Sequence, residues 1–364
     1  MRLVVLIPTM ELAGAQRVLV TLANTLASLE HDVHLVCLTG RGPLVDELSP
    51  AVEYHQLDAA RALPSIGAFR RLLRTLRPVA VISVMQGGYV SLAATAGMRD
   101  RPVLIAGHHD RPRSISSFGS PARTSLVTAS MAAAYRGVDS TVVVCEDSQD
   151  ELAEMLHMAP ERFVVLPNPV DLEELDRLSS TGEAHPLLTS GAPSMVMVAS
   201  HTPKKKISSA IALLSELPEH NLVVLGDGAL RPELERQAAE LGVESRLSLA
   251  GVWTNPFPSM LAADVALSAS TSEALPLGLI EAVVLGARVV STDSGSGTRE
   301  ILRDYDAAVI ADSGAEADLA EAVRRATATA PRADQVDAKR QTYSAVAVAN
   351  RYLDLVAELM GERR

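Results

Sequence analysis

Two glutamates, Glu273 and Glu281, stand eight positions apart in one short segment of the chain, residues 268–300. Glu273 follows an apolar run typical of a buried strand, and Glu281 lies on a helix predicted to begin near Leu277 and Gly278. A helix that begins just beyond a strand offers free backbone N–H groups and a partial positive charge, which suit a diphosphate. Carboxylates before and inside the helix can accept hydrogen bonds from sugar and ribose hydroxyls. The segment predicts a nucleotide-sugar site; a capping carboxylate followed by a surface one is the alternative.

This arrangement resembles the E-x7-E signature of GT-B-fold retaining glycosyltransferases of family 4. Three further segments match the family in the expected order. They are the glycine-containing turn and first helix at Gly14 to Leu26, where Ala13 replaces the first glycine of GGAER; VVLPNPVD at Val164 to Asp171; and the G-x-G, helix and strand at Val223 to Val252. The resemblance covers nearly the whole chain, and its second half is the more specific part.

The resemblance implies a role for each matching residue of the donor site. Glu281 would hold the ribose and Glu273 the transferred hexose. Backbone N–H groups of Leu277 and Gly278 would bind the diphosphate. The base would lie near Gly251 and Val252, contacted mainly through the backbone. Gly14 would let the facing domain approach the phosphate closely, because glycine has no Cβ; a plain strand-to-helix turn is the alternative.

A lysine run corresponds to the family's G-R-L-x-x-x-K-G stretch, in which an arginine and a lysine neutralise the departing diphosphate. In VASHTPKKKISSAI, Val198 to Ile211, the lysine position is Lys205, and Ser200 stands where the arginine is expected. The site therefore lacks one cation unless Lys204, Lys206 or His201 replaces it. A solvated surface cluster is the alternative reading of the three lysines.

His109 corresponds to the family's histidine at the end of a first-domain strand, where it would hydrogen-bond the hydroxymethyl side of the sugar. His108 is a competing assignment. We expect the acceptor side to include Gly87, Gly88 and Arg111. Together with the donor site, the predicted catalytic residues are Glu273, Lys205 and His109.

The resemblance also implies the reaction. A hexose would pass from a nucleotide diphosphate sugar, with uridine as the first guess, to an acceptor hydroxyl by front-side displacement with retention. No cofactor or metal ion is expected, and the D-x-D tripeptide Asp304-Tyr305-Asp306 is interpreted as a turn. The alternatives are a nucleotide-sugar-binding protein without transfer, motivated by Ser200, and a nucleotide-sugar epimerase of the same fold. Phosphate-loop, dinucleotide, esterase and zinc-protease motifs are missing.

The elements that position these residues are short β-branched strands alternating with helices, the pattern of parallel α/β sheets. The pattern runs once, loses its strand character over residues 172–194, and restarts. We therefore predict two doubly wound, Rossmann-like domains facing across a cleft, the GT-B architecture. Their predicted extents are residues 1–171 and 195–342, with 172–194 as a linker. A last helix within 343–364 would pack back on the first domain.

Composition and charge limit the partners. A net charge of −11 disfavours nucleic acid as a partner, and no apolar run is long enough for a membrane span. We expect a cytoplasmic protein. Residues 61–136 carry eleven arginines and two acids, which favours a saccharide, lipid-linked or small-molecule acceptor with anionic character, and peripheral contact with an anionic membrane at its inner face. A solvated helix face is the alternative.

Overall fold

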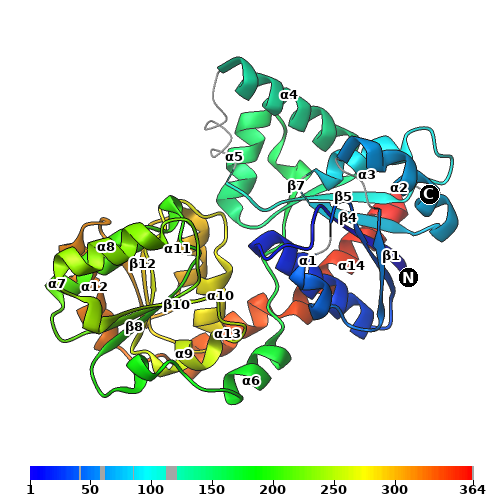
Figure 1. The fold of residues 1–364 in the computed structure, drawn as a ribbon. Helices are drawn as coiled ribbons and strands as arrows, with labels where there is room; N and C mark the ends of the chain where they lie inside the picture. The colour runs from blue at the N-terminus through cyan, green and yellow to red at the C-terminus, as the bar shows by residue number, and fades with distance from the viewer. Residues whose placement is uncertain (41, 58–61, 85, 112–120, 363–364) are drawn as a thin grey trace. The chain divides into compact units, whose positions relative to one another are not determined.

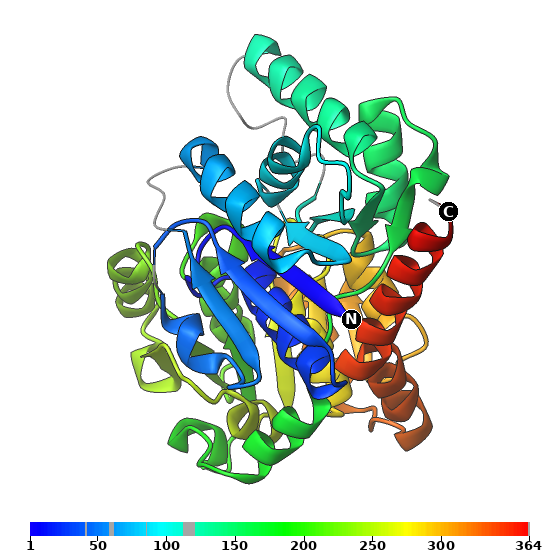
Figure 2. The same ribbon diagram turned by 90° about the vertical axis from the view of Figure 1, so that its right-hand side faces the viewer.

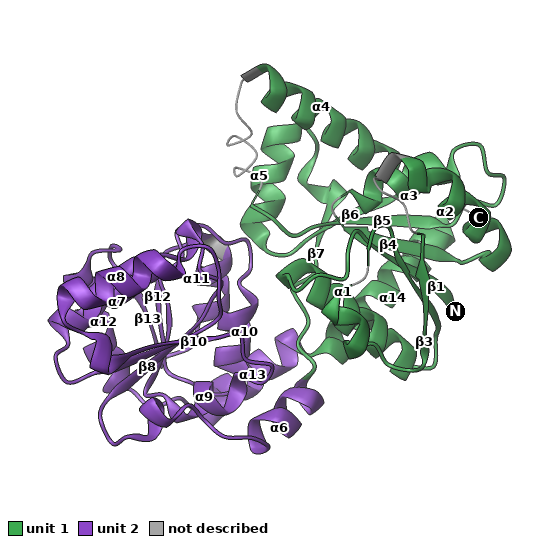
Figure 3. Cartoon of the chain, viewed as in Figure 1, with its two compact units in different colours: residues 1–171, 344–364 green, residues 172–343 purple. Residues whose placement is uncertain are grey.

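The structure is a computed structural model that describes residues 1–40, 42–57, 62–84, 86–111 and 121–362. It divides into two compact units (Figure 3). Unit 1 comprises Met1–Asp171 and Ser344–Arg364, and unit 2 comprises Leu172–Tyr343. Within the basic window of the sequence, Arg61 and Arg113 lie outside the described residues.

Unit 1 contains a seven-stranded sheet in the order β3-β2-β1-β4-β5-β6-β7, with every neighbouring pair parallel (Figure 1). Its strands are β1 (Arg2–Ile7), β2 (Asp32–Cys37), β3 (Val52–Gln56), β4 (Ala80–Val84), β5 (Val103–His108), β6 (Ser140–Val143) and β7 (Phe163–Val165). Its helices are α1 (Gly14–Ser28), α2 (Ala62–Leu76), α3 (Gly87–Thr95), α4 (Pro121–Gly137), α5 (Glu146–Leu156) and α14 (Ala345–Glu362). The central strands, such as β4 and β5, are buried along their whole length because helices cover both faces of the sheet, whereas the edge strand β3 is polar and only partly buried.

The C-terminal helix α14 completes one face of unit 1. Its residues Val348, Tyr352 and Val356 are buried in one apolar cluster with Leu3 of β1 and Leu22 of α1. In Figures 1 and 2 this helix, drawn in red, lies beside the blue first strands of the chain. The other face of the sheet packs against α2 and α3 in a second cluster.

Unit 2 repeats the plan with six parallel strands in the order β10-β9-β8-β11-β12-β13. Its strands are β8 (Ser194–Val198), β9 (Asn221–Leu225), β10 (Leu247–Gly251), β11 (Val265–Ser268), β12 (Val289–Thr292) and β13 (Ala308–Ala311). Its helices are α6 (Leu172–Ser180), α7 (Ile207–Glu216), α8 (Arg231–Leu241), α9 (Phe257–Ala262), α10 (Leu277–Val284), α11 (Ser296–Leu302), α12 (Glu316–Thr327) and α13 (Ala333–Tyr343). The prediction of two doubly wound parallel sheets is confirmed.

The segment predicted as a linker, residues 172–194, instead contains α6 and a short 3-10 helix at Pro186–Thr189, and it belongs to unit 2. Glu173 and Glu174 stand in the first turn of α6, where carboxylates favour helix formation. Leu175 is buried. The Asn255 side chain donates hydrogen bonds to the Leu178 carbonyl, near the end of α6, and to the Thr181 carbonyl just beyond it. The Ser, Gly, Thr and Pro content suggested a linker, but two buried leucines, Leu175 and Leu188, and these hydrogen bonds hold the segment in place.

Candidate active site

The amino end of α10 is partly exposed and uncapped. Pro276 precedes the helix, no side chain of the described residues caps it, and its first turn holds no acid. The backbone N–H groups of Leu279 and Ile280 donate to the Pro276 carbonyl at 3.1 and 3.3 Å, so Leu277 and Gly278 precede the first such bonds. A Cβ added at Gly278 would lie 4.0 Å from the Val198 carbonyl oxygen, which puts the start of α10 beside the carboxyl end of β8. An anion would find two N–H groups and the positive end of a helix here.

Glu273 lies between two lysine ammonium groups. Its Oε1 is 2.8 Å from Lys205 Nζ, and its Oε2 is 3.1 Å from Lys204 Nζ. Burial by itself raises the pKa of Glu273, but the charges and hydrogen bonds of Lys205 and Lys204 outweigh it, so this pKa lies below its usual value. The carboxylate is therefore ionised at neutral pH, and the group as a whole carries one excess positive charge.

Backbone hydrogen bonds join the three loops that form this group. The Thr271 N–H donates to the Lys204 carbonyl at 2.9 Å, and the Glu273 N–H donates to the Ser294 carbonyl at 2.9 Å. The loops after β8, β11 and β12 are thus tied together at one edge of the sheet. Carboxyl ends of parallel strands are where open α/β sheets bind ligands.

Lys204, His201 and Lys206, the three candidates to replace the arginine missing at Ser200, lie in different surroundings. Lys204 reaches Glu273, whereas the His201 side chain is fully buried and Lys206 lines a cavity of about 430 Å³ with Ser209 and Thr292. Ser200 itself is exposed. Lys204 is therefore the second cation beside Glu273; that it replaces the arginine, and not Lys206 or His201, stays a prediction. Its effect on catalysis stays a prediction.

Gly297 is a site residue that sequence reasoning missed. It stands near the start of α11, and an added Cβ would lie 1.6 Å from the Ala274 carbonyl oxygen, immediately after Glu273. Only glycine allows α11 to approach this loop so closely. The glycines of the D-S-G-S-G-T run before a predicted helix were the available signal.

The remaining donor-site residues occupy the same unit. Glu281 is half-buried on α10, one turn into the helix. Gly251 has a φ of +75° at the end of β10, and its carbonyl accepts a hydrogen bond from the Gly226 N–H at 2.7 Å. Val252 follows with an exposed side chain. Because the Gly251 carbonyl is already engaged, a base would meet the backbone of Val252 first; this contact stays a prediction.

In unit 1, His109 is oriented by Asn168. The ring Nδ1 lies 3.2 Å from Asn168 Oδ1, and Nε2 is covered without a hydrogen-bond partner among the described residues. Burial lowers the pKa of His109, although Asn168 and Asp110 oppose the shift. A neutral ring that donates from Nδ1 keeps a lone pair on Nε2, but this atom is covered and faces Gly107, so a ligand hydroxyl would reach it only after the ring turns. A Cβ at Gly107 would lie 2.9 Å from His109 Nε2, so Gly107 makes room for the ring. Sequence reasoning missed Asn168 and Gly107.

The competing residue, His108, faces the interior. It ends β5, is buried, and its Nδ1 lies 3.0 Å from the Tyr135 hydroxyl, whereas His109 is partly exposed. Of the two, the structure brings His109 to the surface.

His108 gives a pH prediction. Burial lowers its pKa from 6.5 to about 4 in the folded protein, so the unfolded chain binds one more proton between these values. The free energy of unfolding should therefore fall as pH drops from 6.5, by about 3 kcal/mol at pH 4. Denaturant unfolding of wild type and His108→Gln across this range isolates the contribution, since the variant should lack it. Parallel pH curves for the two proteins would contradict a buried neutral ring.

The other residues proposed for unit 1 have structural partners of their own. A Cβ at Gly87 would lie 3.0 Å from Ser83 Cβ, and one at Gly88 would lie 3.2 Å from Ala106 Cβ, so close packing explains both glycines. Arg111 pairs with Glu151 at 3.1 Å. An acceptor contact of these three stays a prediction without structural support. Gly14 differs, because a Cβ there would meet nothing within 4 Å; the fold does not require glycine at this turn.

Two family models together account for most of the chain. Residues 12–174 match Glycosyltransferase Family 4, and residues 184–342 match Glycosyl transferases group 1. The chain is 26% identical over 174 residues to an uncharacterized glycosyltransferase of Methanocaldococcus jannaschii, a match covering 46% of this chain and 43% of that protein. The chain thus spans less than half the length of that relative.

Two further comparisons extend over more of the chain. It is 24% identical over 312 residues to the N-acetylgalactosamine-N,N'-diacetylbacillosaminyl-diphospho-undecaprenol 4-alpha-N-acetylgalactosaminyltransferase of Campylobacter jejuni, covering 80% of each. The fold is similar to that of HepE from Anabaena, solved in complex with UDP and glucose, with a TM-score of 0.79, 17% identity and coverage of 98% and 99%.

Two doubly wound sheets of this kind are the GT-B architecture of glycosyltransferases. The family models then assign the chain more narrowly: it belongs to the group 1, family 4 glycosyltransferases.

Proposed function

We propose that this protein transfers a hexose from a nucleotide diphosphate sugar, with UDP as the first candidate carrier, to an acceptor hydroxyl with retention of configuration and without a metal ion. The observation that carries the proposal is the uncapped start of α10 in the same unit as the group formed by Glu273, Lys204 and Lys205. HepE, of similar fold, was solved with UDP and glucose, which supports uridine as the base.

The roles follow from charge and position. In the proposed step the acceptor oxygen forms a bond to the anomeric carbon while the bond to the diphosphate oxygen breaks, and that oxygen takes the acceptor proton. Lys205 and the amino end of α10 stabilise the growing charge on the diphosphate. Glu281 accepts hydrogen bonds from the ribose, Glu273 from the hexose, and His109 Nε2 from a sugar hydroxyl. Fixed positive groups can thus supply the charge stabilisation that a metal ion supplies elsewhere.

The ion pairs of Glu273 have a consequence for donor binding. Without a ligand, its carboxylate holds both lysines at 2.8 and 3.1 Å. An arriving diphosphate offers the lysines a more strongly charged partner, which leaves Glu273 oxygens to accept hydrogen bonds from sugar hydroxyls. Donor binding would therefore exchange partners within a preformed group.

A turnover assay tests this proposal. Purified protein would be incubated with UDP-, GDP-, ADP- and TDP-hexoses, with and without an acceptor panel, in buffer containing EDTA. We expect one donor to be consumed only with an acceptor, and the product to show the donor's anomeric configuration by NMR. Donor binding without turnover would favour the sugar-nucleotide-binding alternative motivated by Ser200, and donor conversion without an acceptor would favour an epimerase. Transfer that occurs only with added metal ion would refute the proposal that the reaction needs no metal.

For the acceptor we propose a lipid-linked substrate at an anionic membrane surface. The Campylobacter jejuni relative is named for a diphospho-undecaprenol acceptor. Among the described residues no helix is both long enough and apolar enough to cross a bilayer, so contact would be peripheral. Arg71 and Arg74 on α2 and Arg77 just after it are exposed, whereas Arg70 donates to the Ala94 and Ala96 carbonyls at 2.8 and 2.7 Å.

Reversing two of these charges should therefore release the protein from anionic vesicles. Each basic residue near such a surface contributes about 1 kcal/mol, so Arg71→Glu/Arg74→Glu should weaken sedimentation with phosphatidylglycerol vesicles by about 30-fold or more. The matched control is Arg324→Glu/Arg325→Glu, which reverses two exposed charges on α12. Equal binding by both double variants would argue against α2 as the contact.

A further inference from the structure

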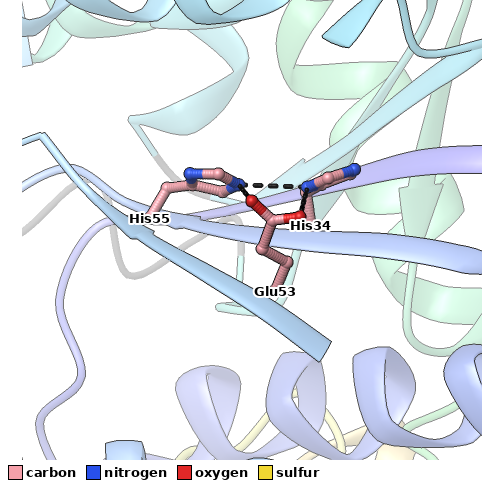
Figure 4. Close-up of side chains that lie close together, drawn as sticks. All are labelled: His34, Glu53 and His55. Atoms are coloured by element: carbon pink, nitrogen blue, oxygen red, sulfur yellow. Dashed lines mark hydrogen bonds and ion pairs between the residues drawn. The ribbon is translucent and has the colours of Figure 1, made fainter. Parts of the chain in front are cut away.

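Three potential metal ligands meet on the edge of the sheet of unit 1. Within the described part of the chain β3 is the edge strand and pairs with β2 alone, in a register that sets Glu53 opposite His34. His55 stands two residues beyond Glu53 on β3, and alternate residues of a strand face the same side. Figure 4 shows the Glu53 carboxylate reaching between the His34 and His55 rings.

The separations of the ligand atoms suit one metal ion. His34 Nδ1 lies 3.0 Å from His55 Nε2; Glu53 Oε2 lies 3.3 Å from His34 Nδ1, and Glu53 Oε1 lies 3.3 Å from His55 Nε2. Ligand atoms at two corners of a tetrahedral zinc site with bonds of 2.0–2.1 Å are about 3.3 Å apart. We propose that His34, Glu53 and His55 bind a divalent transition-metal ion, with zinc as the expected ion.

A cation also explains why three acceptor atoms converge. In neutral imidazole each ring offers one nitrogen with a free lone pair, and an ionised carboxylate offers only acceptors. A single proton between the two rings satisfies one contact, whereas a metal ion bonds to both nitrogens and the carboxylate at once. Two histidines and one glutamate, with a further position left for water, form a ligand set that zinc uses in proteins.

The surroundings provide the outer support that metal-binding histidines usually have. The His34 side chain is only 4% exposed, and its second nitrogen, Nε2, lies 3.1 Å from Asp32 Oδ1. The geometry of this contact is not that of a hydrogen bond, so Asp32 acts through its charge, which favours a proton on Nε2 and leaves Nδ1 for the metal. Asp32 is itself held by Arg2, whose Nε lies 2.6 Å from Oδ2 and whose charge it balances. The Glu53 side chain is 63% exposed, so the open position faces water.

The position of the cluster points to a structural role. His34 is the third of six residues of β2, and Glu53 and His55 are the second and fourth of five residues of β3, so the cluster lies along the middle of these strands and not in the loops at their carboxyl ends. Ligands that react in open α/β sheets bind at the carboxyl ends. The ion would join the edge strand β3 to β2 and stabilise unit 1. This site is independent of the proposed transfer, which needs no metal.

Calorimetric titration of the metal-free full-length protein with zinc chloride tests the proposal. We expect one equivalent to bind to wild type and the dissociation constant to rise at least tenfold in His55→Gln and in Glu53→Gln. Because the Glu53 side chain is mostly exposed, we expect Glu53→Gln to fold as wild type does. Zinc should raise the midpoint of thermal unfolding of wild type, and EDTA should reverse the rise. Cobalt, used as a spectroscopic probe, should give visible absorption bands in wild type that both variants lack.

A control distinguishes this site from ordinary surface binding. His157→Asn removes an exposed histidine elsewhere in unit 1 and should bind zinc as wild type does. The proposal is overturned if wild type binds no zinc, or if His55→Gln and Glu53→Gln bind it as tightly as wild type. Either result would mean that His34 and His55 are joined by a hydrogen bond and not by a metal ion. Sugar transfer measured in EDTA is a separate readout, because its loss would refute the proposed metal-free reaction and leave the zinc titration unaffected.

Discussion

Replacing Lys205 by alanine is expected to lower kcat by about 10²- to 10³-fold, the loss seen when one fixed donor to a developing negative charge is removed. Lys205 Nζ lies 2.8 Å from Glu273, so the change removes the shorter of the two ion pairs and the charge proposed for the leaving diphosphate. Glu273 is only 13% exposed, but it keeps its second ion pair, with Lys204, in this variant. No unpaired buried charge is left, so the free energy of unfolding should fall by about 1 kcal/mol. Activity should therefore fall far more than stability. Steady-state kinetics and denaturant unfolding measure the two effects.

A neighbouring lysine provides the matched control for this loss. Lys206→Asn removes the same charge one position away, and asparagine tolerates the φ of +49° at this residue. Lys206 lines the cavity of about 430 Å³ and forms none of the Glu273 ion pairs given above, so kcat should change by no more than about twofold. Equal losses in the two variants would mean that net charge, and not the contact with Glu273, matters. Full activity of Lys205→Ala would remove Lys205 from the reaction.

Replacing Gly297 by alanine is the second large effect. The new Cβ would lie 1.6 Å from the Ala274 carbonyl oxygen and 2.7 Å from its carbon. These are backbone atoms, so either α11 or the loop bearing Glu273 must move. We expect the free energy of unfolding to fall by about 3 kcal/mol or more, and transfer to fall more than tenfold where the variant remains folded. Denaturant unfolding followed by kinetics at low temperature checks both.

Gly314→Ala is the control in the same unit. A Cβ there would lie 4.0 Å from Thr292 Cγ2, an ordinary contact, and the residue has no positive φ. The change should cost less than about 1 kcal/mol. A Gly297→Ala protein as stable and active as Gly314→Ala would show that the loop is not held in the position described.

The strands were predictable because both sheets are parallel and covered on both faces. Most strands are then short apolar runs rich in β-branched residues, such as Leu3 to Ile7, that the sequence shows directly. The order of strand, loop and helix around Glu273 and Glu281 was predictable for the same local reason. α6 was missed because it is short and polar. Its stability depends on the burial of Leu175 and on the hydrogen bond from Asn255, which only the fold brings to it.

The remainder of the site depends on contacts between distant segments. Lys204, Lys205 and Lys206 are adjacent and chemically alike, so only the path of the chain decides which of them reach Glu273. Asn168 and Gly297 act through neighbours far away in sequence, at His109 and Ala274. The pairing of His34 with Glu53 likewise needs the register of two strands. No local pattern contains this information.

A crystal structure of the protein with UDP is the most direct test of the proposed donor site. We predict diphosphate oxygens about 3 Å from the backbone N–H groups of Leu277 and Gly278 and from Lys205 Nζ, with the ribose on Glu281. UDP bound elsewhere, with Glu273 still holding both lysines and the start of α10 unoccupied, would contradict it.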